Sequence, residues 1–351
     1  MTVLKTIDEL RAPWLAEALG APVVGFSTRP VGTGQMGESF RVELTYDGAP
    51  TAPASVVVKL ASTDPSSRAT GLALRAYEVE VSFYRTVAST LQVRVPACHL
   101  AEVDVDTGWF TLLLEDMAPA TQGDHFAGVD ADAAALAMVE LAGLHGPRWD
   151  DPALAAQGWL NRQTPQALTF TTGLVRSLWP GFLDRYGDQL APEHVAVCER
   201  LVDRLGPYLL DRRGPLSVVH GDYRLDNLLF GPPGGTAPLT VVDWQTAVWG
   251  PPLVDAAYFL SFAFADRGVR AATERDLLRV YHDALRGFGV ESFDFDRCWS
   301  DYRRSSFAAL VMAIASSMLV ERTERGDRMF LTTVERACAQ VEDLDALALL
   351  P

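Results

Sequence analysis

The stretch VVHGDYRLDNLLF at residues 218–230 decides the fold, together with LTVVDWQ at residues 239–245. Each stretch begins as a short apolar run of strand type and then changes to polar residues. In the first, Asp222 and Asn227 lie five positions apart in a loop between two apolar runs. In the second, Asp243 ends the apolar run and follows Asn227 by sixteen positions. Packing alone explains such dense polar loops poorly, so we predict that both loops carry chemistry.

The first loop has the spacing H-x-D-x-x-x-x-N of a kinase catalytic loop, from His220 to Asn227. In that role Asp222 would accept the proton of an acceptor hydroxyl, and Asn227 would hold a magnesium ion. We expect His220 to orient the loop through a hydrogen bond. Arg224 follows Asp222 by two positions, where a cation could steady the transferring phosphate, and Asp226 is expected to cap the turn.

Phosphoryl transfer needs a second carboxylate on the magnesium ion, because the metal bridges phosphate oxygens and offsets developing charge. Asp243 fits this role, although an aspartate at the end of a strand is more often a turn or helix cap. We expect Asp222 and Asp243 to meet around one nucleotide-bound cation. Asp255 begins a predicted helix after Gly-Pro-Pro, and both N-capping and bracing of the catalytic loop are open for it.

A glycine motif of the GxGxxG type comprises Gly32, Gly34 and Gly37. A dinucleotide-binding turn must open a helix, whereas the glycine loop of a kinase lies between two antiparallel strands and folds over ATP phosphates. Residues 40–46 alternate between apolar and polar side chains, which predicts a strand and favours the kinase loop. Ser39 takes the position where valine is usual. An ordinary glycine hairpin remains an alternative for the motif taken alone.

A lysine, Lys59, lies near the end of the predicted strand SVVVKL at residues 55–60. In a kinase it would bind the α- and β-phosphates and would be held by a carboxylate on a helix. We predict that helix over residues 72–89, with Glu80 as the favoured partner and Glu78 as the second candidate. A solvent-facing lysine on an edge strand is the alternative.

The order of these motifs carries more weight than any one of them, because it is the order found in kinases. We predict an α+β fold of the bilobal protein-kinase-like type, with a cleft between the lobes as the ligand site. Residues 1–117 would form a small antiparallel β-rich N-lobe that binds nucleotide. Residues 118–351 would form a larger, mainly helical C-lobe that binds the acceptor and carries the catalytic loop. Further elements are expected as a strand at 110–114 and as helices at 131–145, 166–177, 193–211, 272–288 and 297–321.

The stretches VVHGDYRLDN and VVDWQ resemble the aminoglycoside phosphotransferase and choline kinase superfamily, which shares the protein kinase fold. EVSFY at residues 80–84 is similar to the E-x-x-F-Y helix of these proteins, and LAGLHG at 141–146 to their LA-LHA helix. LLEDM at residues 113–117 resembles their hinge. The resemblance implies that the hinge backbone, with Glu115 and Met117, pairs with adenine. The motifs are most similar to the ecdysteroid-kinase-like branch and to the branch associated with acyl-CoA dehydrogenases.

The resemblance implies an ATP-dependent phosphotransferase that uses Mg²⁺ and moves the γ-phosphate to a hydroxyl of a small molecule. Aminoglycoside-like, steroid-like and hydroxyacyl acceptors are open. A protein substrate is not expected, because no DFG, no APE and no activation segment of the protein-kinase type lies between Asp243 and Asp255. The alternatives are a catalytically silent nucleotide-binding pseudokinase and a dinucleotide oxidoreductase, which would need a helix directly after Gly37.

Composition excludes other classes of protein. The 351 residues are 48% hydrophobic, which allows a large core and excludes global disorder, and the net charge of −15 argues against nucleic acid or an anionic membrane as a partner. Four cysteines without a CxxC pair favour a reducing, cytoplasmic location. The most apolar stretch, residues 307–320, is too short to span a bilayer and predicts a buried helix.

Overall fold

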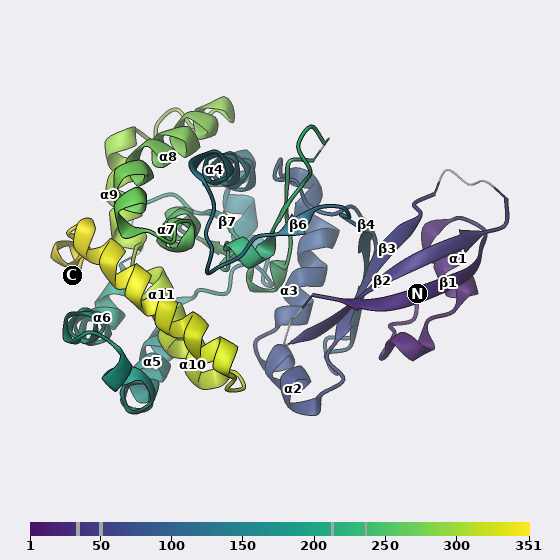
Figure 1. Cartoon of the computed structure of the whole chain (residues 1–351), viewed down its shortest axis with the longest axis horizontal. Helices are drawn as coiled ribbons and strands as arrows, with labels where there is room; N and C mark the ends of the chain where they lie inside the picture. The colour runs from purple at the N-terminus through teal and green to yellow at the C-terminus, as the bar shows by residue number, and fades with distance from the viewer. Residues whose placement is uncertain (33–35, 49–51, 212–213, 236) are drawn as a thin grey trace. The chain divides into compact units, whose positions relative to one another are not determined.

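The computed structural model describes residues 1–32, 36–48, 52–211, 214–235 and 237–351. The chain forms two compact units, whose elements are labelled in Figure 1. The first unit contains Met1–Thr90, Arg94–Thr121 and Gly231–Ala247, and the second contains Leu91–Val93, Gln122–Phe230 and Val248–Pro351. The segment that carries Asp243 therefore belongs to the same unit as Lys59 and Glu80, although it lies far along the chain.

The first unit is built on a five-stranded sheet in the order β1-β2-β3-β5-β4, with every neighbouring pair antiparallel. The strands predicted at 40–46, 55–60 and 110–114 are present as β2, β3 and β5. β1 and β4 were not predicted, and Gly25 and Pro30 give β1 the composition of a loop. The strands are β1 (Val23–Val31), β2 (Gly37–Tyr46), β3 (Ser55–Ala61), β4 (Cys98–Val103) and β5 (Phe110–Glu115), with the short β9 (Leu239–Val241) in the returning segment.

The helices of this unit pack on the sheet, α1 on β1 and α3 on β4 and β5. One continuous helix over residues 72–89 was predicted, and this is wrong. Arg75 adopts a left-handed backbone with φ of 57°, which a right-handed helix cannot continue, so α2 ends and α3 begins there. The helical segments are α1 (Ala12–Leu19), α2 (Pro65–Ala73), α3 (Ala76–Ser82) and a π-helix η2 (Phe83–Val87), with 3₁₀ turns η1 (Ile7–Glu9), η3 (Ala88–Thr90) and η8 (Trp244–Thr246).

The second unit is a helical assembly in which α7 (Leu253–Phe262) contacts α8, α9, α10 and α11. Nearly every residue of α7 is buried, so its apolar side chains show no amphipathic period, and the sequence predicted only that a helix begins at Asp255. The antiparallel pair β7 (Ser217–Val219) and β10 (Val248–Gly250) lies beside it in this unit, with β8 (Leu228–Phe230). The other helices are α4 (Ala131–His145), α5 (Pro165–Tyr186), α6 (Pro192–Leu210), α8 (Arg267–Gly287), α9 (Phe295–Ser305), α10 (Ala308–Leu319) and α11 (Glu324–Asp343).

Most predicted helices of this unit are present, but the single helix expected at 297–321 is wrong. It is two helices, because the backbone turns at Ser306, whose hydroxyl donates to the carbonyl of Arg303 at 2.8 Å. The helix predicted from residues 307–320 is present as α10, but only one side of it is buried, and Leu319 at its end is exposed. Among the described residues, no helix is both long and apolar enough to cross a membrane.

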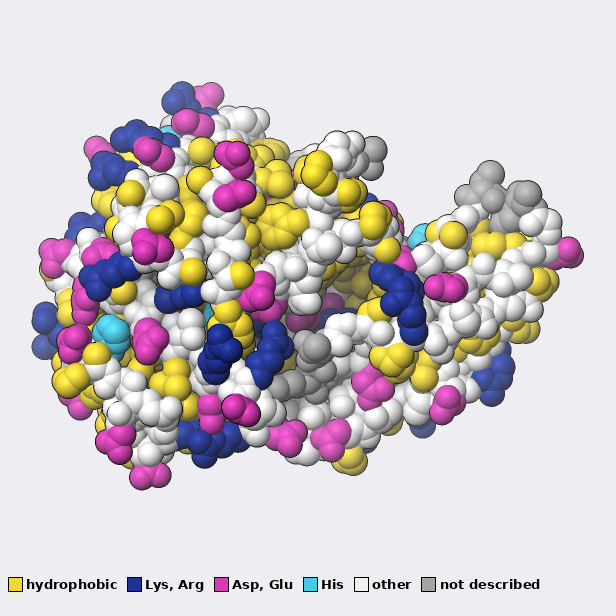
Figure 2. Space-filling model, in the orientation of Figure 1, with side chains coloured by type: hydrophobic (Ala, Val, Ile, Leu, Met, Phe, Trp, Pro, Cys, Tyr) yellow, Lys and Arg dark blue, Asp and Glu magenta, His cyan; other side chains and the backbone are white. Residues whose placement is uncertain are grey.

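The predicted fold class, a β-rich smaller part and a mainly helical larger part, is confirmed. Short connections complete it: β6 (Thr121–Gln122), η4 (Gly146–Arg148), η5 (Pro152–Ala156), η6 (Gly187–Gln189), η7 (Leu225–Asn227) and η9 (Ala346–Leu349). On the face shown in Figure 2, acidic side chains in magenta and basic side chains in dark blue are interspersed rather than gathered by sign.

Candidate active site

In the first unit, three predicted residues come together around the ammonium group of Lys59. Its Nζ lies 2.8 Å from Oε1 of Glu80 on α3 and 2.7 Å from Oδ1 of Asp243. Glu78, the second candidate, instead pairs with Arg75. Burial opposes the charge on Lys59, but Asp243 and Glu80 outweigh it and raise the pKa of the ammonium above its usual range. Lys59 therefore stays positively charged, which its predicted contact with phosphate requires.

Aromatic stacking holds Asp243 beside this lysine. The ring of Trp244, the next residue, stacks on Phe83 with centroids 3.9 Å apart and planes 7° apart. Phe83 follows Glu80 by three positions, so one helical surface contacts both the lysine and the tryptophan. Asp243 itself has a left-handed backbone with φ of 69°, an unusual conformation for a residue other than glycine that is often found at functional sites.

The glycine motif lies in the connection between the antiparallel strands β1 and β2. Gly32 has φ of 77°, which glycine adopts without strain, and Gly34 lies outside the described residues. A Cβ at Gly37 would lie 3.0 Å from the carbonyl of Leu60, so a side chain would disturb the pairing of β2 with β3. Ser39 pairs with Lys59 across these strands. Because a strand and not a helix follows Gly37, the dinucleotide-binding alternative is wrong.

The predicted hinge begins at the end of β5. The Glu115 carboxylate is bound by Arg94 at 2.7 Å and by the amide of Ala97 at 2.9 Å. The next residue, Asp116, is bound by Arg41 and by Ser55 at 2.7 Å each. The carboxylates of Glu115 and Asp116 are therefore bound by other groups of the protein. The adenine contacts expected through the backbone at Glu115 and Met117 stay a prediction.

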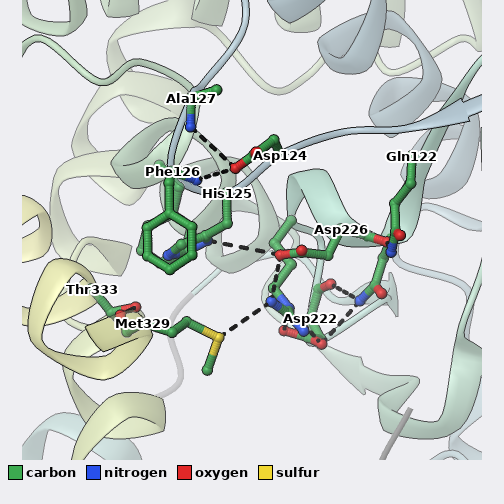
Figure 3. A network of polar contacts seen from close by, with 12 residues as sticks. Gln122, Asp124, His125, Phe126, Ala127, Asp222, Asp226, Met329 and Thr333 are labelled. Carbon is green, nitrogen blue, oxygen red and sulfur yellow. Dashed lines mark hydrogen bonds and ion pairs between the residues drawn. The ribbon is translucent and has the colours of Figure 1, made fainter. Parts of the chain in front are cut away.

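In the second unit, three polar side chains contact the carboxylate of Asp222 in the predicted catalytic loop, and Figure 3 shows where Asp222 and Asp226 lie. Oδ1 of Asp222 accepts a hydrogen bond from Tyr258 at 2.9 Å, and its Oδ2 accepts one from Asn227 at 2.9 Å. Arg224 forms an ion pair with the same carboxylate at 3.1 Å and a second with Asp226 at 2.6 Å. Asp226 thus binds Arg224, a contact that its expected role as a turn cap did not include.

The amide of Asn227 is oriented by its two donated hydrogen bonds. Its Nδ2 contacts both the backbone oxygen and the Oδ2 of Asp222, each at 2.9 Å, which leaves Oδ1 as the side-chain atom suited to a cation. Oxygen donors such as this amide and the carboxylate of Asp243 are what Mg²⁺ prefers. Within the described ranges, no three His, Cys, Asp or Glu side chains form a ready metal cluster. The shared cation expected from the sequence stays a prediction.

Asp255 braces the catalytic loop from α7. This fully buried carboxylate accepts the backbone amides of His220 at 2.6 Å and Gly221 at 2.9 Å. The N-cap position of α7 is Pro252, so the bracing role, which the sequence left open beside capping, is the one observed. His220 in turn accepts the amide of Asp222 at 3.2 Å, and the ring of His145 lies 3.4 Å from Asp255.

The sequence did not reveal Tyr258 as a member of this group. It follows Asp255 by three positions, so both side chains project from one face of α7. Burial, and then the charge of Asp222, raise the pKa of Tyr258 well above its usual range. The phenol therefore stays protonated and always donates to Asp222. The spacing of three positions from Asp255 was the one signal in the sequence for Tyr258. It was hard to recognise because the neighbouring residues of α7 are apolar.

Residues 30–289 match the family described as "Phosphotransferase enzyme family", which covers well over half of the chain. The chain belongs to this family, and its class is that of the phosphotransferases. The resemblance that the motifs predicted is thereby confirmed.

Similar curated proteins match only a short segment. Acyl-CoA dehydrogenase family member 10 of Mus musculus is 42% identical over 64 residues, which are 18% of this chain and 6% of that protein. Acyl-CoA dehydrogenase family member 11 of Homo sapiens is 34% identical over 79 residues, 22% of this chain and 10% of that protein. The matched segments thus span a tenth or less of these relatives.

Solved structures match along nearly the whole chain. A microcompartment-associated aminopropanol kinase has a TM-score of 0.57 at 16% identity, covering 95% of this chain and 97% of that one. The ethanolamine kinase of Plasmodium vivax has a TM-score of 0.54 at 10% identity, covering 95% and 84%. The GDP complex of aminoglycoside 2'-phosphotransferase-IIIa has a TM-score of 0.53 at 14% identity, covering 90% and 94%. At these identities the likeness shows the fold.

Proposed function

We propose that this protein transfers the γ-phosphate of ATP to a hydroxyl group of a small molecule. The observation that carries the proposal is the carboxylate of Asp222, which Tyr258 and Asn227 hold at 2.9 Å on a loop braced by Asp255. A carboxylate oriented in this way is suited to receive a proton from an alcohol.

The first unit would bind the nucleotide. We assign Lys59, steadied by Glu80, to the α- and β-phosphates. The glycine motif and Ser39 would cover the phosphates, and the backbone at Glu115 and Met117 would contact adenine. In this assignment residues 1–117 form the nucleotide-binding lobe. The GDP complex of a structural neighbour supports a nucleotide substrate for this fold.

In this assignment residues 118–351 form the catalytic and acceptor-binding lobe, and the segment with Asp243 within them belongs to the first compact unit. Asp222 would orient the acceptor hydroxyl and take its proton while the oxygen forms a bond to the γ-phosphorus. The bond from that phosphorus to the bridging oxygen breaks, and ADP leaves. Arg224 would steady the transferring phosphate. Asn227 and Asp243 would hold Mg²⁺, which neutralises charge on the phosphate oxygens.

The acceptor would be a small alcohol. The aminopropanol kinase and the ethanolamine kinase among the structural neighbours support this class by their names. Aminoglycoside-like, steroid-like and hydroxyacyl alcohols are the candidates. The partial match to acyl-CoA dehydrogenase family members favours testing hydroxyacyl compounds early.

A nucleotide-binding pseudokinase is the second candidate function, and the presence of Lys59, Asp222, Asn227 and Asp243 argues against it. Asp222→Ala should keep Mg·ATP affinity and lose turnover, whereas Asp243→Ala should lose the magnesium-dependent part of ATP binding. Calorimetry with ATP, with and without Mg²⁺, measures the affinity. A screen of ATP consumption over a library of alcohols measures turnover. An Asp222→Ala enzyme as fast as the natural one would refute the proposal.

A further inference from the structure

The imidazole of His125 is buried without a hydrogen-bond partner. His125 lies in the loop between β6 and α4 and is 3% exposed. Neither of its ring nitrogens has a hydrogen-bond partner in the part of the chain that the structure describes. Nearly all buried polar atoms in folded proteins are paired, so an unpaired imidazole next to a catalytic loop requires a functional explanation.

The loop that carries His125 is held firmly from both sides. The amide of Gly123 donates to the carbonyl of Leu228 at 3.0 Å, and a Cβ at Gly123 would lie only 2.7 Å from the carbonyl of Leu225. Arg336 of α11 donates to the carbonyl of His125 at 2.9 Å and to that of the next residue. The position of the ring is therefore set by the fold and is not the result of a loose loop.

The ring faces the carboxylate of Asp226, as Figure 3 shows, with Nδ1 4.0 Å from Oδ2. Phe262 packs against it with centroids 4.7 Å apart. Burial, and then the charges of Arg224 and Arg336, lower the pKa of His125 to about 3. The imidazole is therefore neutral near pH 7, with one N–H donor and one lone pair.

The oxygen that faces His125 is the one that binds Arg224. Oδ2 of Asp226 accepts Nη1 of Arg224 at 2.6 Å, and Arg224 also pairs with Asp222. Arg224 is thus held between two carboxylates, whereas the proposed reaction needs it at the transferring phosphate. The side chain of Asp226 is largely buried. When Arg224 turns away, Oδ2 of Asp226 therefore loses its closest hydrogen-bond donor in a place with little access to water.

We propose that His125 is a positioning residue that binds Asp226 when Arg224 turns to the phosphate. This inference rests on the proposed function. In the tautomer protonated at Nδ1, the imidazole needs to approach by roughly 1 Å to donate to Oδ2. Asp226 then keeps a donor while Arg224 is released. Arg325 is the other cation near this carboxylate, 3.8 Å from Oδ1, but its side chain is 67% exposed and hydrated.

Two substitutions separate this role from simple packing. His125→Phe keeps an aromatic ring against Phe262 and removes the unpaired nitrogens, so the melting temperature should hold or rise while kcat falls about tenfold. His125→Asn keeps a donor near the place of Nδ1 and should restore most of kcat, although it packs less well. If the ring of His125 only fills space, His125→Phe should have a higher kcat than His125→Asn.

Slow release of phosphate from Mg·ATP in water is the readout, because it needs no identified acceptor. Asp222→Ala is measured alongside. Loss of activity in Asp222→Ala together with full activity in His125→Phe would overturn the inference and leave the proposed function standing. Equal rates for the natural protein and Asp222→Ala would overturn the proposed function and the inference with it.

A second measurement is independent of turnover. In protein labelled with ¹⁵N-histidine, the His125 signals are identified by their absence in His125→Phe. Addition of Mg²⁺ and a non-hydrolysable ATP analogue should shift the Nδ1 signal toward that of a hydrogen-bonded donor, and Asp226→Asn should abolish that shift. Nucleotide binding that leaves the His125 signals unchanged would overturn the inference.

Discussion

The hydroxyl of Tyr258, on α7, lies 2.9 Å from Oδ1 of Asp222 in the loop after β7. A phenol with a raised pKa keeps its proton and donates it in a hydrogen bond. It therefore fixes Oδ1 of Asp222 and, with it, the direction of the second lone pair of that oxygen. The proposed proton acceptor is thus oriented by a helix that also carries Asp255, the residue that braces its loop.

Tyr258→Phe removes this donor and little else. We expect kcat to fall about tenfold, as for loss of a hydrogen bond to a charged group, with the KM for ATP unchanged. Steady-state ATP consumption checks both values. Tyr223→Phe is the matched control, because the Tyr223 hydroxyl is also buried but donates to the carbonyl of Ala137 at 2.7 Å. Equal losses of kcat in the two variants would show that Tyr258 acts through packing.

Lys59→Met leaves two carboxylates without their shared cation. Glu80 is 1% exposed, so its unpaired charge is costly, and we expect the free energy of unfolding to fall by about 3 kcal/mol. Glu78→Gln breaks the exposed pair with Arg75 on the same helix and should cost less than about 0.5 kcal/mol. Urea unfolding measures both. Adding Glu80→Gln to Lys59→Met should recover part of the loss, and no recovery would argue against charge as its cause.

Asp255→Asn tests the brace. It exchanges a carboxylate that accepts two buried backbone amides for an amide that accepts less strongly, and we expect unfolding to become easier by about 2 kcal/mol. Asp266→Asn is the control, because Asp266 caps α8 at the surface, where asparagine is as good as aspartate. If Asp255→Asn were as stable as the control, the catalytic loop would have to be held by other contacts.

The buried His125 predicts a loss of stability in acid. The unfolded chain takes up a proton at this residue as the pH falls below about 6.5, whereas the folded protein, with the pKa lowered to about 3, does not. The unfolded state then binds more protons, so the contribution of this group is present above about pH 6.5 and is lost progressively toward pH 3.

His125→Phe removes this contribution. We expect the difference in melting temperature between His125→Phe and the natural protein to grow in favour of the variant as the pH falls from 7.5 to about 5. Differential scanning calorimetry at several pH values checks this. A difference that is constant with pH would mean that the folded protein protonates His125 as readily as the unfolded chain does.

The sequence predicted the fold class because its motifs follow one another in the order found in kinases. The alternation in β2, the apolar run of β3 and the polar loops after β7 and β9 are local patterns, and each is readable within about ten residues. The division of the predicted helix at Arg75 was not readable, because a left-handed backbone at an arginine is imposed by packing and not by composition. The extent of α7 was not readable either, because burial on all sides removes the period that reveals a helix, and only a helix start at Asp255 was predicted.

The residues of the candidate site also fall into two groups, those that the sequence indicated and those that it did not. Lys59, Glu80, Asp222, Asn227 and Asp243 were proposed from the sequence, since each lies in a motif with its own spacing. Sequence alone preferred Glu80 to Glu78, but the tertiary structure decided it by turning Glu78 toward Arg75. Tyr258 and His125 were missed, because each meets the catalytic loop from an element distant in the chain.

The sequence by itself therefore determined which reactive groups this protein has and the class of fold that carries them. Only the tertiary structure decided which of these groups touch: that Asp243 shares Lys59 with Glu80, that Asp255 binds the loop instead of capping its helix, and that Arg224 lies between two aspartates. The physical reason is that spacing along a chain governs neighbours within one element. Hydrogen bonds and ion pairs between elements depend on how buried surfaces pack, and no local pattern records that packing.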